Sequence, residues 1–130
     1  MARDSSAAPA AAAKRGRLTR AAEFDAVASL GKAVAGRYLT LRFREAGGGE
    51  ARVGFAVPRK VGGAVERNAV KRRLREAVEQ RRERLQPGTD YVFIARSGIA
   101  PLLEAKGMTW LGGQIDELMA QAHPEAVRQR

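Results

Sequence analysis

The sequence predicts a single-domain α+β fold with a mixed sheet, and three features of the chain support this. Apolar and polar residues alternate over residues 37–43 and again over 52–57, which is typical of strands with one buried face. A helical period of apolar residues runs over residues 65–85. Residues 91–95 are apolar without alternation, as in a strand covered on both faces. A chain of 130 residues suits one domain with short tails.

The first expected element is a short helix near the start of the ordered domain, which we place at residues 17–122. Thr19 is its expected N-cap, and Phe24, Val27 and Ala28 are spaced for one helix face. Residues 1–16 are expected to form a disordered Ala-rich tail, because alanine and proline offer little to bury. Residues 123–130 are expected to form a second tail.

The two alternating segments are expected to be adjacent strands of a hairpin, joined by the flexible residues 47–49. In the first segment, one face carries the apolar side chains Leu39, Leu41 and Phe43. The opposite face carries Tyr38, Thr40 and Arg42.

Glycine and proline mark the ends of the remaining elements. Pro58 ends the second strand, and Pro87 ends the long helix. The strand at 91–95 follows a helix, which indicates a crossover connection and therefore a mixed sheet. A last helix is expected after Pro101, with an apolar stripe of Leu111, Ile115, Leu118 and Met119. Three glycines weaken its first half: Gly107, Gly112 and Gly113.

Composition narrows the possible functions. The chain has 24 Lys and Arg against 14 Asp and Glu, a formal net charge of +10, so it attracts polyanions. Nucleic acid is the first candidate, while charge alone leaves anionic membranes and acidic proteins open. The absence of cysteine excludes disulfides and thiolate metal sites, and a cytoplasmic location is expected. The one histidine, His123, falls in the expected tail and the carboxylates are scattered, so we predict no catalytic residue and no metal site in this chain.

The long helix carries a directional set of basic residues. One flank is apolar and comprises Val70, Leu74, Ala77, Val78 and Leu85. Beside it, polar residues at helical spacing share one face: Asn68, Lys71, Arg72, Arg75 and Arg82. Arg59, Lys60 and Arg67 lie at or before the helix start.

Two interpretations of this face compete. It could be a solvated surface, in which Arg72–Glu76 and Arg75–Glu79 pairs stabilise the helix by about 0.3 kcal/mol each. The alternative is phosphate binding. It is favoured because guanidinium groups grip phosphate through paired hydrogen bonds and Asn68 adds a directional amide.

Residues 59–76, RKVGGAVERNAVKRRLRE, resemble the RNA-binding motif of the bacterial ribonuclease P protein subunit. The resemblance extends over most of residues 17–120. It implies a two-layer α/β sandwich of the ribosomal protein S5 domain 2-like type, with element order α-β-β-β-α-β-α. It also implies a four-stranded mixed sheet with a left-handed βαβ crossover, against the usual right-handed rule.

The resemblance implies a subunit of an endoribonuclease that removes 5′ leaders from precursor tRNAs. In that family the catalytic RNA binds Mg²⁺ and carries the chemistry, so the implied partners are this RNA and precursor tRNA, with neither membrane nor DNA. The free protein is expected to be monomeric. A structural RNA-binding protein of ribosomal type is the alternative, and a protein-only nuclease is disfavoured by the lack of ligands.

Two sets of site residues follow from the resemblance. The catalytic RNA is expected to contact Arg59, Lys60, Arg67, Asn68, Lys71, Arg72 and Arg75. The leader is expected to contact Arg17, Phe24, Tyr38, Thr40 and Arg42. Ala69 departs from the family motif and removes one polar contact, while Ala28 and Arg42 replace aromatic residues of relatives. Phe24 has a competing interpretation as a core residue, because a helix needs an inward aromatic anyway.

Overall fold

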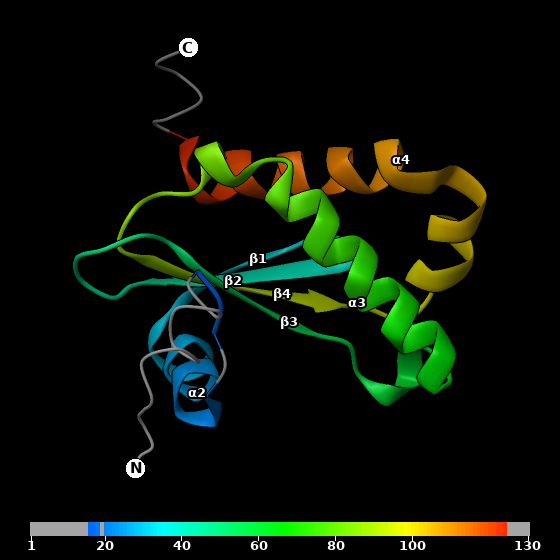
Figure 1. Ribbon diagram of the computed structural model, residues 1–130, viewed down its shortest axis with the longest axis horizontal. Coiled ribbons are helices and arrows are strands. Elements are labelled where there is room, and N and C mark those ends of the chain that lie inside the picture. The colour runs from blue at the N-terminus through cyan, green and yellow to red at the C-terminus, as the bar shows by residue number, and fades with distance from the viewer. Residues whose placement is uncertain (1–15, 19, 125–130) are drawn as a thin grey trace.

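The computed structural model describes residues 16–18 and 20–124, which form a four-stranded sheet with helices on both faces (Figure 1). The helices are α2 (Ala21–Leu30), α3 (Ala64–Glu79) and α4 (Ile99–Ala122). The strands are β1 (Lys32–Ala35), β2 (Leu39–Glu45), β3 (Arg52–Ala56) and β4 (Thr89–Ala95). Two short 3-10 turns are η1 (Arg59–Val61) and η2 (Arg82–Arg84). The predicted α+β class and the order α-β-β-β-α-β-α are confirmed.

The strand order is β1-β2-β4-β3, with β3 and β4 parallel and the other neighbours antiparallel. The predicted mixed sheet is therefore confirmed, but the predicted hairpin of residues 37–43 with 52–57 is wrong. The hairpin partner of β2 is β1, and β4 lies between β2 and β3. The physical reason is burial: β4 is the most apolar strand and takes a central place, where both of its faces are covered.

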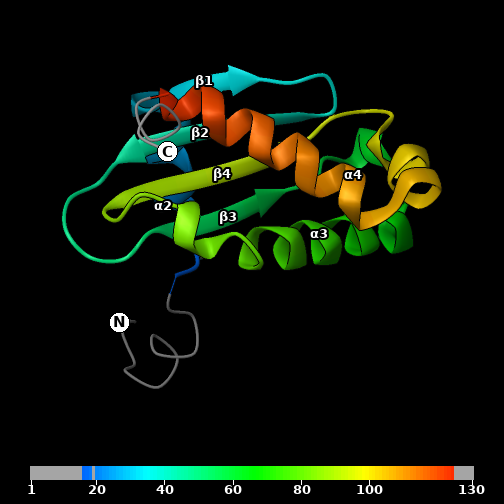
Figure 2. The same cartoon turned by 90° about the horizontal axis from the view of Figure 1, so that it is seen from above.

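The connection from β3 to β4 is left-handed. In Figure 2, α3 and α4 face the viewer and β3 points to the right. The chain passes from β3 through α3, on the near side of the sheet, to β4, which lies above β3 in this view. A right-handed crossover would place β4 below β3, so the handedness implied by the family resemblance is confirmed.

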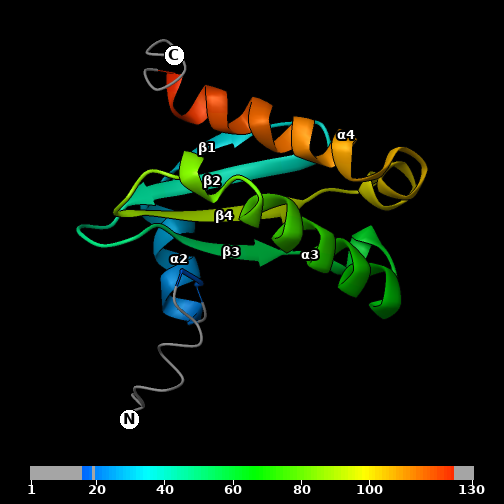
Figure 3. The same ribbon diagram turned by 45° about the horizontal axis from the view of Figure 1, so that its top comes forward.

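The helices form two unequal layers. Helices α3 and α4 cover one face of the sheet, and α2 covers the other (Figure 3). The main core lies under α3 and α4 and includes the fully buried Leu41, Leu74 and Phe93. A small second core under α2 contains Leu18, Val27 and Val92, with Phe24 and Ile94 packed against it.

The helix boundaries differ from prediction in three places. Helix α2 begins at Ala21 with Arg20 at its N-cap, while Thr19 lies outside the described residues. Helix α3 ends at Glu79 because Arg81 leaves the helical region (φ −122°, ψ 20°) as the chain turns towards β4. Helix α4 begins at Ile99, before Pro101, and its predicted apolar stripe is buried.

Candidate nucleic-acid interface

Basic residues and one asparagine of η1 and α3 form a largely exposed surface, here called the basic row. Its members are Arg59, Lys60, Arg67, Asn68, Lys71, Arg72 and Arg75. Turn η1 presents Arg59 and Lys60, and α3 presents Asn68, Lys71 and Arg72, all of them exposed. The structure thus brings all seven predicted residues together on η1 and one flank of α3.

Local contacts hold the half-buried members of the basic row. The Arg67 Nε–H donates to the Gly62 carbonyl at 3.2 Å. The Gly63 N–H donates to Glu66 Oε1 at 3.0 Å, which caps the first turn of α3. The Arg75 guanidinium lies 6.0 Å from the centre of the Phe55 ring, so it is steered towards the β3 edge.

Within the described residues, no carboxylate pairs with a cation of the basic row. The Arg72–Glu76 and Arg75–Glu79 pairs of the solvated-surface interpretation are not formed. Glu79 pairs with Arg82 instead, at 3.2 Å. The cations of the row therefore present their charge to solvent, where phosphate oxygens can reach it.

Arg82 does not belong to the basic row, contrary to the helical-wheel prediction. Because α3 ends at Glu79, Arg82 lies in η2 and its guanidinium reaches the N-terminal segment. Its Nη2 donates to the Gly16 carbonyl at 3.0 Å. Gly16 and Leu18 in turn pair with Val53 on the outer edge of β3, so this arginine anchors the start of the domain.

A second surface lies where α2 meets the sheet, here called the α2 surface: Phe24, Thr40 and Arg42. Thr40 and Arg42 are half-buried on the face of β2 that α2 covers, and the Arg42 Nη1 donates to the Ala28 carbonyl at 2.9 Å. Phe24 is half-buried, with its ring over Gly54. Arg17 does not share this surface: it is exposed on the β3 edge and pairs with Val53, whose side chain belongs to the main core on the opposite face of the sheet.

Tyr38 is not part of the α2 surface, which corrects the expectation that it shares a face with Thr40 and Arg42. Its ring packs edge-on against Trp110 of α4, with ring centres 5.7 Å apart, and Arg37 lies 5.6 Å from its centre. The reason is that β2 begins only at Leu39, so the strand alternation does not extend to residue 38.

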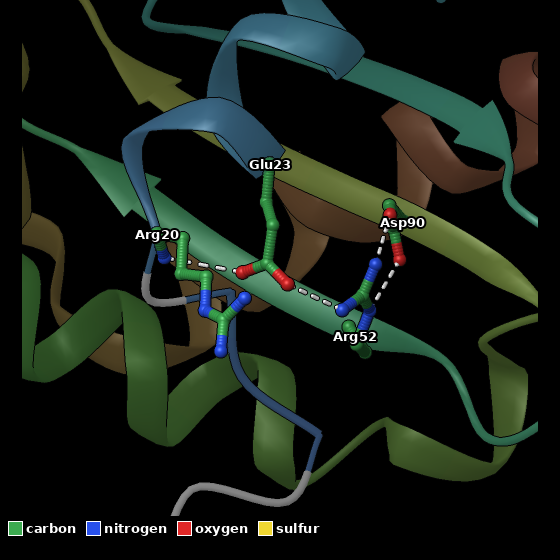
Figure 4. A network of polar contacts seen from close by, with 4 residues as sticks. All are labelled: Arg20, Glu23, Arg52 and Asp90. Carbon is green, nitrogen blue, oxygen red and sulfur yellow. Dashed lines mark hydrogen bonds and ion pairs between the residues drawn. The ribbon is translucent and has the colours of Figure 1, made fainter. Parts of the chain in front are cut away.

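Four residues that sequence reasoning did not single out form a polar network between α2 and the sheet (Figure 4). Arg52 of β3 forks onto Asp90 of β4 and reaches Glu23 of α2, which accepts the Arg20 backbone N–H. The hydrogen bond and charge of Asp90 raise the pKa of Arg52, against the effect of burial. The signal in the sequence was Asp90, a carboxylate next to an apolar strand.

His123 is not in a tail. It caps the end of α4, its Nε2 lies 2.7 Å from the Tyr91 hydroxyl, and its ring packs against Phe43. Residues 125–130 lie outside the described part. No group of three or more His, Cys, Asp or Glu in the described chain could hold a metal ion, and none of its helices is long and apolar enough to span a membrane.

The sequence is similar to known proteins of one family. The family model for ribonuclease P matches residues 12–120. The ribonuclease P protein component of Pelotomaculum thermopropionicum is 40% identical over 80 residues, covering 62% of this chain and 71% of the relative. That of Chloroflexus aurantiacus is 39% identical over 106 residues, covering 82% and 76%.

Solved structures show the same fold. The ribonuclease P protein of Thermotoga maritima superposes with a TM-score of 0.75 at 28% identity, covering 82% of this chain and 97% of that one. The Staphylococcus aureus protein, at 23% identity, supports the fold alone, with a TM-score of 0.71 over 84% of this chain and 96% of that one. The chain therefore belongs to the ribonuclease P protein family.

Proposed function

We propose that this chain is the protein subunit of ribonuclease P and binds two RNAs on two surfaces. The basic row contacts the catalytic RNA, and the α2 surface contacts the single-stranded 5′ leader of precursor tRNA. The observation that carries the proposal is the basic row itself, an arginine-rich surface whose cations have no carboxylate partner in the described chain.

The geometry of each surface suits its proposed RNA. A structured RNA offers phosphates in a fixed register, which exposed guanidinium and amide groups on a rigid helix can match. A single strand offers unstacked bases, which can stack on the partly exposed Phe24 ring or on the Arg42 plane. Because Tyr38 packs on Trp110 and Arg17 pairs with Val53 on the other face of the sheet, we restrict the leader site to Phe24, Thr40 and Arg42.

Chemistry is assigned to the RNA subunit. The described residues offer no cluster of metal-ligating side chains, and the one histidine bonds a buried tyrosine and packs at the end of α4. We therefore place the Mg²⁺ that supports hydrolysis on the RNA. The protein contributes affinity for the substrate and reduces repulsion between two polyanions, in a complex that we place in the cytoplasm.

Reconstitution tests this function. The purified chain, mixed with a cognate catalytic RNA at low Mg²⁺, is expected to increase cleavage of precursor tRNA at the mature 5′ end. No increase would reject the assignment. Cleavage without any RNA subunit would instead indicate a protein-only nuclease, and crosslinking that recovers only ribosomal RNA would indicate a ribosomal-type protein.

Single substitutions distinguish the roles of the two surfaces. Phe24→Ala is expected to weaken cleavage of precursors with a long leader but not of those whose leader is a single nucleotide, because one stacking contact of about 1 to 3 kcal/mol is lost. Binding of the catalytic RNA should stay unchanged. An equal loss on substrates with a long leader and with a single-nucleotide leader would show that Phe24 serves only as a core residue.

A further inference from the structure

Apolar packing alone holds α2 weakly to the sheet. The cluster beneath it has three buried members, Leu18, Val27 and Val92, whereas the core on the other face of the sheet is far larger. A helix of ten residues is also marginal in isolation. The orientation of α2 therefore depends on contacts beyond this small core.

The polar network supplies such contacts through a single side chain. Arg52 Nε and Nη2 donate to the two carboxylate oxygens of Asp90 at 2.9 and 2.7 Å. Its third nitrogen, Nη1, donates to Glu23 Oε2 at 2.6 Å (Figure 4). The other oxygen of Glu23 accepts the Arg20 N–H at 3.1 Å, at the first turn of α2. Arg52 thus joins β3, β4 and α2.

Burial makes this arrangement specific to arginine. Asp90 is only 3% exposed, so its charge must be neutralised and hydrogen-bonded within the protein. A planar guanidinium can fork onto one carboxylate and still direct a nitrogen at a second one. The ammonium of a lysine is a compact point charge and cannot reproduce that fixed geometry.

The network is placed next to the proposed leader site. Glu23 directly precedes Phe24 in α2, and Arg52 lies two residues before Gly54 on the same face of β3. The Phe24 ring lies over Gly54, where an added Cβ would be 2.5 Å from the ring Cζ. The contact of Arg52 with Glu23 therefore lies one residue away from the ring that covers Gly54.

We propose that Arg52 is a positioning residue for leader recognition: by joining Asp90 to Glu23 it sets the place of Phe24, without contacting RNA itself. This inference rests on the proposed function of the α2 surface. All three guanidinium nitrogens of Arg52 already donate to carboxylates, which supports a role within the protein.

The test compares Arg52→Lys and Glu23→Gln with wild type in the reconstituted complex. Two substrates are used: a precursor with a long leader and one whose leader is a single nucleotide. Lys keeps a charge beside Asp90, and Gln keeps an acceptor for the Arg20 N–H, so both variants are designed to fold. For each, we expect kcat/KM to fall about fivefold on the long leader only, as for partial loss of one stacking contact.

Arg81→Lys is the matched control. Arg81 lies just after α3, and its Nε donates to Asp116 of α4 at 2.8 Å, on the face of the sheet opposite α2. This variant likewise loses a guanidinium–carboxylate hydrogen bond between two elements but should leave the leader dependence at the wild-type value. Hydrogen exchange gives a readout without RNA: the amides of α2 should exchange faster in Arg52→Lys, and those of α4 should not.

The outcomes separate this inference from the proposed function. If wild type shows leader dependence and Arg52→Lys retains it in full, or if both substrates are affected equally, the positioning role is overturned. If wild type itself shows no leader dependence, the proposed function of the α2 surface fails, while faster exchange in α2 would still establish that Arg52 positions the helix.

Discussion

Single residues at the contact of α2 with the sheet show how little space the fold leaves there. Gly54 is buried beneath the Phe24 ring, and a Cβ at this position would also lie 3.1 Å from the Cβ of Leu18. Because residue 54 is glycine and has no Cβ, α2 can approach β3 closely.

Gly54→Ala is expected to lower the free energy of unfolding by about 1 to 3 kcal/mol, because the Phe24 ring must move out of contact. Urea denaturation measures the change. Gly48→Ala is the control, since its Cβ meets nothing within 4 Å and the position lies in the connection between β2 and β3. Its effect should stay within about 0.5 kcal/mol. Equal effects of the two substitutions would contradict the packing argument.

Tyr91 supplies a prediction about pH. Burial raises its pKa above the ordinary value of 10.0, although the hydrogen bond from the Gln86 N–H acts in the opposite direction. The folded state therefore holds the phenolic proton more tightly than the unfolded state does. This contribution to stability is complete below about pH 10 and is lost as the pH rises through the folded pKa.

Tyr91→Phe should therefore unfold more easily at about pH 7, by about 1 kcal/mol, because the Gln86 N–H loses its acceptor. The difference from wild type should shrink above about pH 10, where only the wild-type protein loses stability through this group. Urea denaturation at the two pH values checks this. A difference that stays constant or grows at the higher pH would show that Tyr91 does not titrate as described.

At the residue scale, the sequence predicted the positions of exposed cations better than those of half-buried side chains. The spacing of Asn68, Lys71 and Arg72 on a helix places them on one face wherever the helix packs. Tyr38 was misplaced because its face depends on the first residue of β2. His123 was misplaced because its contact with Tyr91 joins residues far apart in the chain.

At the scale of elements, three glycines of α4 that looked equivalent in the sequence have three different environments. Gly107 adopts φ 77° and ψ −166°, a conformation open almost only to glycine, and it breaks α4 into two segments. A Cβ at Gly112 would lie 2.1 Å from the Arg81 Nη2, whereas one at Gly113 would meet nothing within 4 Å.

Substitution of each glycine by alanine should therefore change the free energy of unfolding by a different amount or in a different direction. Gly113→Ala should stabilise the protein by about 0.5 to 1 kcal/mol, through helix propensity alone. Gly107→Ala should destabilise it by about 1 to 3 kcal/mol through backbone strain. In Gly112→Ala the gain in helix propensity should be offset, because the new Cβ forces Arg81 away from Asp116. Thermal unfolding ranks the three, and any order other than 113, 112, 107 would contradict these assignments.

The order of the strands was the part of the fold that local pattern could not supply. Alternation in residues 37–43 and 52–57 predicted two strands but not their partners, because pairing depends on which strand takes the centre. The unbroken apolar run of β4 indicated burial on both faces. Its position between β2 and β3, however, depends on contacts between residues far apart in the sequence. Strand β1 has no clear alternation of exposure, so only the family resemblance implied it.

On the scale of the whole molecule, the sheet separates the two proposed RNA sites. The basic row lies on the side of α3 that faces the β3 edge, and the α2 surface lies on the opposite face of the sheet (Figure 3). With a net charge of +10, the protein can attract both RNAs, but only the basic row combines exposed arginines with a rigid helix.

Salt dependence distinguishes specific phosphate contacts from this general attraction. Each phosphate neutralised by the protein contributes about 0.7 to 0.9 to the slope of log K against log salt. Arg72→Ala and Arg67→Ala are each expected to weaken binding of the catalytic RNA and to reduce the slope by about that amount. Arg73→Ala removes the same charge from the flank of α3 outside the basic row, so it should leave the slope nearly unchanged. Filter binding over a range of salt concentrations measures the binding constant and its salt slope. Equal slopes for Arg72→Ala and Arg73→Ala would show that the basic row does not contact phosphate more than the rest of α3 does.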